Sequence, residues 1–339
     1  MPNLPKHILV IRLSAMGDVA MTVPVLRALT QAYPELKITV LTRGFFAPFF
    51  RDLKQVEVLS ADLKNKHKGI LGLYKLSKEI KALHIDAVAD LHNVLRSNIL
   101  KLFLIGKPCK QINKGRPEKK ALTTGKIFHQ LKTTHQRYAD VFQNLGFKID
   151  LSNPNFPEKS TLNKNCKAVL GTFKQKQIGI APFAAHEGKM YPLALMKEVI
   201  QALSKDYKVY LFGGGKKEMD ALNNMANSFE NVTNLAGKLT LNEELDLISN
   251  LDVMLSMDSG NAHIAAMLGV KVITIWGVTH PYAGFAPFNQ PFDYLLTPDR
   301  AKFPKIPTSI YGNKFPEGYE KAAATITPSV VVNTLKSIL

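Results

Sequence analysis

A glycine turn between two apolar runs constrains the fold of this chain more than any other feature. The runs cover residues 251–257 and 270–276, and Ser259-Gly260 separates the first run from a short helical segment at 261–268. An apolar run, a glycine turn and a helix in this order predict a strand that leads directly into a helix N-terminus. Such a junction directs free backbone N–H groups and a helix dipole at one point, which suits a phosphate.

A second junction of this kind lies near the N-terminus, where the apolar run 8–13 leads into Ser14-Ala15-Met16-Gly17-Asp18. From there onward, short apolar runs alternate with amphipathic segments, a pattern typical of parallel sheets with helical crossovers. Expected strands cover 8–13, 37–41, 56–59 and 87–90, and a second series covers 177–181, 209–212, 232–235, 252–257 and 270–276. Expected helices include 19–33, 70–83, 193–203, 216–228, 241–250, 261–268 and a last one that starts at Thr327-Pro328.

The stretch 150–167 is rich in Asn, Pro, Ser and Lys and predicts a linker between the two series. The fold class is therefore α/β, with two open, doubly wound domains. Ligands of such sheets bind at the carboxyl ends of the strands, and the cleft between the two domains is the expected active site.

Positive charge is concentrated in the first half of the sequence. Residues 1–170 hold 28 Lys+Arg and 12 Asp+Glu, whereas 171–339 hold 16 and 15. The densest stretch, 101–137, holds ten basic residues and one acidic residue. This imbalance predicts an anionic partner for the first half: nucleic acid, a phosphorylated lipid surface or a phosphorylated substrate.

Composition excludes several other classes of protein. No apolar stretch reaches the ~20 residues of a membrane helix. We also expect no signal peptide, because no small-residue cleavage site follows the first apolar run. Cys109 and Cys166 lack metal-binding or redox spacing, so we expect reduced thiols in a cytoplasmic protein. A nucleophile elbow, a Walker A loop and a cluster of metal ligands are also missing from the sequence, and no metal is expected.

Two residues have the chemistry of a group-transfer site. Asp18, next to Gly17, lies near the start of an expected helix, where a carboxylate either caps the helix or takes a proton from a hydroxyl nucleophile. Lys189 is the lone cation in the loop 182–192, which follows a strand. It is either a surface lysine or the group that neutralises a leaving phosphate.

Three further turns are expected to contact a ligand. Glu218 follows the run Gly213-Gly214-Gly215, where it either accepts a ribose hydroxyl or caps a helix. In the turn 236–241, Thr240 is expected to cap the helix that follows, and the exposed backbone is expected to contact a nucleobase. The donor-binding candidates are Gly17, Glu218, Ala236, Gly237, Thr240, Leu241, Asp258, Ser259, Gly260 and His263.

In this order and spacing, the motifs resemble glycosyltransferase family 9, the lipopolysaccharide heptosyltransferases. The resemblance runs over most of the chain. It rests on the segment 8–19 with Pro24, on 90–97, on Lys189 with Tyr191-Pro192, on 236–241, and on Asp258-Ser259-Gly260 with His263, Trp276-Gly277 and Thr279 to Pro281.

The resemblance implies a GT-B fold, in which two Rossmann-like domains face each other. It implies an acceptor-binding domain over 1–160, a donor-binding domain over 161–325, and a last helix at 326–339 that packs back on the first domain. It further implies inverting transfer of a heptose from a nucleotide donor, usually ADP-heptose, to a lipopolysaccharide core. Asp18 would be the general base, and Lys189 would stabilise the leaving diphosphate.

On this interpretation, the basic half binds the anionic glycolipid acceptor, in peripheral contact with the cytoplasmic face of the inner membrane. The candidate acceptor contacts are Arg96, Lys110, Arg116, Lys119 and Lys120. The nucleotide sugar is a co-substrate, and no separate cofactor is expected. We also expect a monomer that binds no nucleic acid. Two alternatives are a sugar-nucleotide epimerase, which needs no basic acceptor face, and a nucleic-acid-binding protein. The second is disfavoured because the stretch 101–137 holds only two aromatic residues, Phe103 and Phe128.

Overall fold

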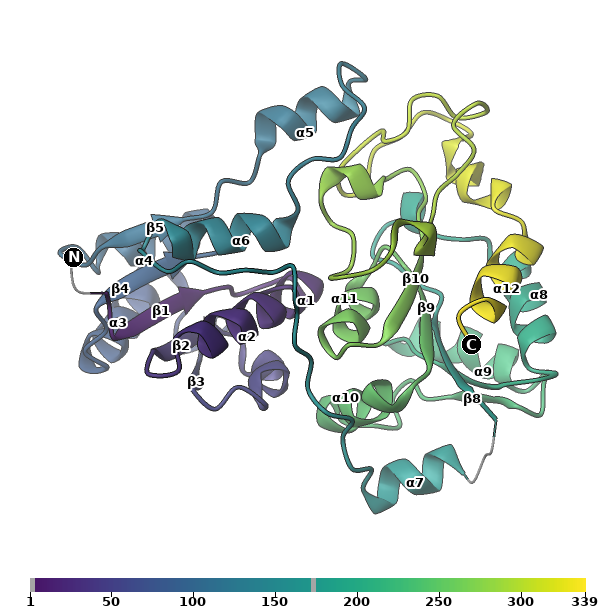
Figure 1. The fold of residues 1–339 in the computed structure, drawn as a ribbon, viewed down its shortest axis with the longest axis horizontal. Coiled ribbons are helices and arrows are strands. Elements are labelled where there is room, and N and C mark those ends of the chain that lie inside the picture. The colour runs from purple at the N-terminus through teal and green to yellow at the C-terminus, as the bar shows by residue number, and fades with distance from the viewer. Residues whose placement is uncertain (1–3, 172–174) are drawn as a thin grey trace. The chain divides into compact units, whose positions relative to one another are not determined.

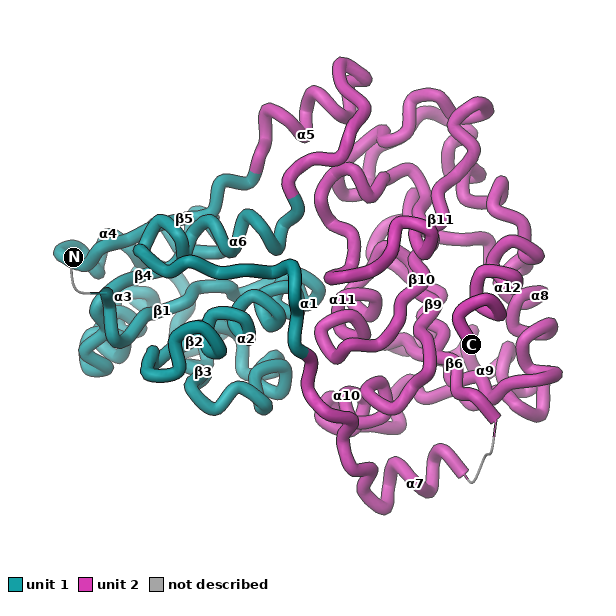
Figure 2. Tube along the Cα trace, viewed as in Figure 1, with its two compact units in different colours: residues 1–114, 133–155 teal, residues 115–132, 156–339 magenta. Residues whose placement is uncertain are grey.

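The computed structural model describes residues 4–171 and 175–339. These residues form two compact units (Figure 2). Unit 1 comprises the chain up to residue 114 together with 133–155, and unit 2 comprises 115–132 and the chain from 156 onward. The basic segment 115–132 thus leaves the first unit and belongs to the second, which no local pattern in the sequence indicated.

Unit 1 is built on a five-stranded parallel sheet in the order β3-β2-β1-β4-β5 (Figure 1). Its strands are β1 (His7–Ile11), β2 (Lys37–Thr42), β3 (Val56–Ser60), β4 (Ala87–Asp90) and β5 (Cys109–Gln111). The ends of the central strands are in register, because Ile11 pairs with both Leu41 and Asp90. Loops that follow β1 and β4 therefore start from the same edge of the sheet.

Amphipathic helices cover this sheet. They are α1 (Met16–Ala20), α2 (Thr22–Ala32), α3 (Gly69–Ala82), α4 (Leu95–Leu102) and α6 (Thr134–Gln143), with a 3-10 helix at Gly44–Phe50. The single helix expected over 19–33 is two helices, α1 and α2, which meet at Met21. Strand β5 was not predicted because its three residues are polar and exposed at the sheet edge, where apolar periodicity is lost.

Unit 2 contains a six-stranded parallel sheet in the order β11-β10-β9-β6-β7-β8. Its strands are β6 (Gln177–Ala181), β7 (Lys208–Leu211), β8 (Val232–Asn234), β9 (Val253–Met257), β10 (Lys271–Ile275) and β11 (Leu295–Leu296). At the carboxyl edge, Ala181 pairs with Ser256 and Met257 pairs with Ile275. The loops after β6, β9 and β10 consequently begin side by side.

The helices of unit 2 are α5 (Arg116–Thr123), α7 (Lys164–Leu170), α8 (Leu193–Leu203), α9 (Lys216–Ala226), α10 (Leu241–Asn250), α11 (Gly260–Met267) and α12 (Pro328–Lys336), with 3-10 helices at Glu187–Lys189, Pro281–Ala283, Phe292–Tyr294 and Tyr319–Thr325. The prediction of two α/β domains with parallel sheets is confirmed. Among the residues that the structure describes, no helix is long and apolar enough to cross a membrane.

The terminal helix α12 lies against α8 within unit 2. That it also packs back on the first domain stays a prediction. Val331 and Leu335 are fully buried in the same apolar core as Met196 and Ile200 of α8. The Tyr191 hydroxyl also donates to the Ile326 carbonyl, 2.7 Å away, just before α12. Apolar burial on α8 therefore decides where this helix docks.

We expect Leu335→Ala to lower the free energy of unfolding of unit 2 by about 2–4 kcal/mol, because it opens a cavity in the core. The matched control on the same helix is Val330→Ala, since Val330 is 46% exposed. Trp276 is the only tryptophan and is buried in unit 2, so its fluorescence during urea unfolding reports this unit. An unchanged transition for Leu335→Ala would contradict the packing of α12.

Candidate functional site

A buried carboxylate, Asp258, organises the carboxyl edge of the sheet in unit 2. The Lys189 ammonium lies 2.8 Å from Asp258 Oδ2 and also donates to the Asp258 carbonyl oxygen at 3.3 Å. The Thr279 hydroxyl donates to the same Oδ2 at 2.9 Å. Asp258 follows β9, Thr279 lies beyond β10, and Lys189 ends the 3-10 helix after β6. Three neighbouring strand ends thus converge on one ion pair.

The N-terminus of α11 begins directly after Asp258. Ser259 is its N-cap residue, but its side chain makes no capping hydrogen bond and instead lies 3.0 Å from the Ser256 hydroxyl. The first backbone N–H groups of the helix, from Gly260 onward, therefore remain available to an anion. His263 is buried one turn further along the same helix. The structure brings Lys189, Asp258 and the helix start together.

Three glycines, Gly188, Gly277 and Gly312, hold the loop that carries Lys189. The Gly188 carbonyl accepts a hydrogen bond of 2.7 Å from the Val278 N–H. At Gly277, an added Cβ would collide with that carbonyl oxygen. Gly312, at φ +76°, packs so closely on the Lys189 stem that a Cβ would lie 2.6 Å from Cγ. The position of the ammonium thus depends on backbone contacts that only glycine permits.

Glu218 and Thr240 both bind backbone N–H groups near the start of a helix. The Glu218 carboxylate accepts from the Gly214 N–H at 2.8 Å at the start of α9. Thr240 and Glu243 form a capping box at the start of α10, with the Thr240 N–H donating to Glu243 at 2.9 Å. Hydrogen bonds from Asn165, Thr240 and Asn163 lower the pKa of Glu243 to about 2. The N-cap predicted for Thr240 is confirmed.

The turn before Thr240 needs its glycine. Gly237 has φ +76°, and an added Cβ would lie 2.8 Å from the Met219 methyl group on α9. The preceding Ala236 N–H donates to the Asn234 side chain at 2.9 Å. The start of α9 and the turn 236–241 therefore lie next to each other in unit 2.

In unit 1, Asp18 forms an ion pair with a residue that the sequence analysis did not select. Arg12 Nη2 lies 2.7 Å from Asp18 Oδ2, and the Ala15 N–H donates to the same oxygen at 3.3 Å. Within the described part of the chain, Oδ1 makes no hydrogen bond or ion pair. The side chain of Asp18 is 29% exposed, against 8% for Arg12. Arg12 also donates to the Leu91 carbonyl at 2.7 Å, which anchors the pair beyond β4. The feature of the sequence that could have indicated this partner is a lone arginine near the end of the apolar run 8–13.

The residues after β4 support this loop. Asp90 is fully buried, accepts from the His92 and Asn93 N–H groups at 3.0 and 2.8 Å, and pairs with Lys101 at 2.7 Å. His92 Nδ1 accepts from the Leu13 N–H at 3.4 Å. Burial and the nearby cations Arg12 and Lys114 lower the pKa of His92 to about 4. The ring is therefore neutral near pH 7 and able to accept this hydrogen bond.

The acceptor candidates fall in different units. Arg96 and Lys110 are exposed on α4 and β5 of unit 1, whereas Arg116, Lys119 and Lys120 lie on α5 of unit 2. The segment 115–132 is held there partly through a hydrogen bond of 2.9 Å from the Leu131 N–H to the Tyr282 carbonyl. Lys119 is buried, with its ammonium 4.0 Å from the centroid of the Phe285 ring. Lys119 thus has a packing role that its charge alone did not indicate.

This assignment changes the distribution of charge. By units, unit 1 holds 20 Lys+Arg against 10 Asp+Glu, and unit 2 holds 24 against 17. Both units are therefore clearly positive. The contrast between a basic half and a nearly neutral half of the sequence therefore does not apply to the two units.

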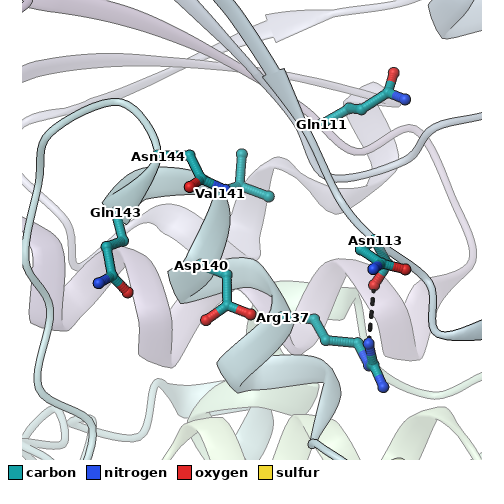
Figure 3. Close-up of a pocket in the computed structure, with 7 residues that line it drawn as sticks. All are labelled: Gln111, Asn113, Arg137, Asp140, Val141, Gln143 and Asn144. Atoms are coloured by element: carbon teal, nitrogen blue, oxygen red, sulfur yellow. Dashed lines mark hydrogen bonds between the residues drawn. The ribbon is translucent and has the colours of Figure 1, made fainter.

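A polar cavity of about 340 Å³ lies in unit 1 beside α6 (Figure 3). It is lined by Gln111, Asn113, Arg137, Asp140, Val141, Gln143 and Asn144. Arg137 Nη1 donates to the Asn113 carbonyl at 3.3 Å across its rim. Amide and charged groups of this kind can bind hydroxyl groups. In the ranges 4–171 and 175–339, no group of three or more His, Cys, Asp or Glu could hold a metal ion.

We expect Gly277→Ala to lower the stability of unit 2 by about 1–3 kcal/mol, because the new methyl group displaces the Gly188 carbonyl. Gly214→Ala is the matched control, since an added Cβ there meets nothing within 4 Å. Trp276 fluorescence during urea unfolding measures both. Equal transitions for the two variants would show that the Lys189 loop is not held by this contact.

The chain is similar to known glycosyltransferases. Its sequence matches the model of glycosyltransferase family 9 (heptosyltransferase) over residues 73–304. The lipopolysaccharide core heptosyltransferase OpsX of Haemophilus influenzae is 25% identical over 300 residues, which cover 84% of this chain and 83% of that protein.

Solved structures agree in fold. A family 9 glycosyl transferase of Veillonella parvula has a TM-score of 0.77 at 19% identity and covers 98% of this chain and 97% of its own. The E. coli heptosyltransferase WaaC with ADP has a TM-score of 0.69 at 19% identity, with 98% and 100% covered. Since the family model spans well over half of the residues, the chain belongs to glycosyltransferase family 9 and is a glycosyltransferase of the GT-B fold.

Proposed function

We propose that the chain transfers a heptose from ADP-heptose to a hydroxyl group of a lipopolysaccharide core, with inversion at the anomeric carbon. The observation that carries this proposal is the ion pair of Lys189 with Asp258 at the N-terminus of α11. The family description names heptosyltransferases, and WaaC of E. coli is known with ADP and with ADP-2-deoxy-2-fluoro heptose. Family membership favours transfer over the epimerase and nucleic-acid alternatives.

Lys189 and α11 supply the donor half of the chemistry. An ammonium group has three donors, and among the residues that the structure describes it contacts the Asp258 carboxylate and the Asp258 carbonyl. One N–H therefore remains for an oxygen of the leaving diphosphate. Backbone N–H groups from Gly260 onward add dipoles that are already oriented before charge develops. Asp258 and Thr279 act as positioning residues, because they hold the ammonium without touching the sugar.

Asp18 supplies the acceptor half. Because Arg12 and the Ala15 N–H both bind Oδ2, Oδ1 is left to receive the proton of the acceptor hydroxyl. The hydroxyl oxygen then forms a bond to the anomeric carbon, while the bond from that carbon to the diphosphate breaks and ADP leaves. Arg12 positions the base and never contacts the reacting atoms.

The remaining site residues divide by unit. We assign unit 2 to the donor, with Glu218 and the turn formed by Ala236, Gly237, Thr240 and Leu241 around the nucleoside, and with Ser259 and His263 near the diphosphate. The exposed cations Arg96 and Lys110 of unit 1, and Arg116 and Lys120 of α5, serve the anionic acceptor. Lys119 acts indirectly, since it fixes α5 on Phe285.

Donor binding tests the assignment of Lys189. We expect ADP to raise the thermal midpoint more than UDP or GDP does. Lys189→Met should weaken ADP about 10- to 100-fold in calorimetry, because a hydrogen bond to a charged group contributes roughly 1.5–3 kcal/mol. Lys197→Met, at an exposed position on α8, is the matched control. Unaltered ADP affinity in folded Lys189→Met would show that Lys189 does not bind the donor. A larger stabilisation by UDP than by ADP would contradict ADP-heptose as the donor.

Turnover tests the assignment of Asp18. Asp18→Asn keeps the shape of the side chain but cannot take a proton, so we expect kcat to fall about 10²- to 10⁴-fold. ADP affinity should change less than about twofold, because a general base in unit 1 does not bind the nucleotide. Asp52→Asn, at an exposed position of unit 1, is the control. Near-normal transfer by Asp18→Asn would exclude the residue as the base.

A further inference from the structure

Two helices of unit 1, α3 and α4, expose large apolar side chains to solvent. On α3, Leu71 is 78% exposed and Tyr74 is 45% exposed. On and after α4, Leu95, Leu102 and Ile105 are 76%, 65% and 81% exposed. Together with Ile70 these residues form what we call the apolar patch. Single exposed leucines are common, but a group of this kind marks a binding surface.

The members of the apolar patch are neighbours. Helices α3 and α4 contact each other (Figure 1), and the rings of Tyr74 and Phe103 pack edge to face with centroids 5.5 Å apart. Leu71 lies about one turn before Tyr74, and Leu102 directly precedes Phe103. Residues three apart share a helix face, so Leu71 and Tyr74 lie together on α3, and the ring contact places Tyr74 next to the end of α4.

The exposure does not come from a missing core. The opposite faces of both helices are buried in unit 1, where Leu73, Leu76 and Ile80 of α3 pack with Leu100 of α4. Each helix therefore buries one apolar face and also exposes large apolar side chains on its outer side. Since an exposed apolar face contributes nothing to the core, something other than the stability of unit 1 accounts for it.

The surroundings of the apolar patch are basic. The segments 64–81 and 95–110 together hold ten Lys+Arg and a single acidic residue, Glu79. Glu79 is already paired with Lys66 at 2.8 Å. Exposed lysines lie on the patch itself, since the Lys78 ammonium is 4.7 Å from the centroid of the Tyr74 ring. The net charge next to the exposed leucines is thus strongly positive.

The positive charge around the apolar patch distinguishes between the partners that could bind it. The cores of protein–protein interfaces are depleted in lysine, and two copies of this surface would repel each other. An anionic lipid surface attracts the lysines while its acyl region accepts leucine and isoleucine side chains, and long lysine stems can lie along the interface with their ammonium groups at the headgroups.

We propose that the apolar patch on α3 and α4 docks this protein on an anionic lipid surface. Apolar side chains enter the boundary between headgroups and acyl chains, and the surrounding lysines bind the headgroup phosphates. This inference adds a partner, the lipid surface, to the proposed function. It rests on the proposed function in one respect, namely that the acceptor is anchored in a lipid. Docking would keep the enzyme at the surface where such an acceptor is anchored.

Vesicle binding by the full chain tests the proposal without measuring catalysis. We expect co-sedimentation with vesicles of phosphatidylethanolamine and phosphatidylglycerol, at least tenfold weaker binding to pure phosphatidylcholine, and a steep loss in high salt. The variant L71S/L102S/I105S should bind the anionic vesicles at least tenfold more weakly. F292S/Y311S/V330S is the matched control, because these residues of unit 2 are also exposed. Circular dichroism verifies that both variants are folded.

Each outcome of these experiments supports or overturns the proposal. Equal binding by wild type and L71S/L102S/I105S would overturn the proposal, as would equal binding to both kinds of vesicle. Sedimentation showing a wild-type dimer that this variant converts to a monomer would assign the apolar patch to a second copy instead. Transfer to a soluble, deacylated acceptor should be unchanged in the variant. Vesicle binding without transfer would count against the proposed function alone, and transfer without vesicle binding would count against this inference alone.

Discussion

The ion pair between Lys189 and Asp258 is the interaction on which the donor side of the structure depends. Asp258 is 7% exposed, and an unpaired carboxylate at such a position would cost several kcal/mol. Its partners come from the loops after β6 and β10. The pair therefore forms only if three neighbouring strands end in register and Gly188 and Gly277 allow their backbones to touch. The requirement to pair one buried charge thus fixes the loops around the N-terminus of α11.

The carboxylate of Asp18 is held differently, and the difference fits its proposed role. Asp258 is enclosed and serves its neighbours, whereas Asp18 is partly exposed and bound on one oxygen only. Arg12 keeps that oxygen in place from a buried position and leaves the other oxygen open to solvent or substrate. A general base needs an accessible oxygen in a fixed orientation, and a positioning group needs neither exposure nor a free lone pair.

Charge along the sequence and charge on the folded units give different pictures. The segment 115–132 is part of the basic half of the sequence, yet it packs on the loop around Tyr282 and Phe285 of unit 2. Its lysines therefore belong to the unit that carries the donor candidates. Of the 20 Lys+Arg in unit 1, ten lie in the segments 64–81 and 95–110, on and around α3 and α4 with their exposed leucines. Positive charge in unit 1 thus lies next to exposed apolar side chains.

Local patterns in the sequence by themselves determined the α/β class, most strands, the two glycine junctions and the N-cap at Thr240, because each depends on residues only a few positions apart. The tertiary structure alone decided the partners: Arg12 for Asp18, Thr279 for Asp258, Phe285 for Lys119, and α8 for α12. It also decided that β5 is a strand, since its polar residues pair only because β4 lies beside them. Lys189 and Asp258 are 69 residues apart. Periodicity reports which face of an element is buried, but contacts at such separations form only when the sheet brings its strand ends together.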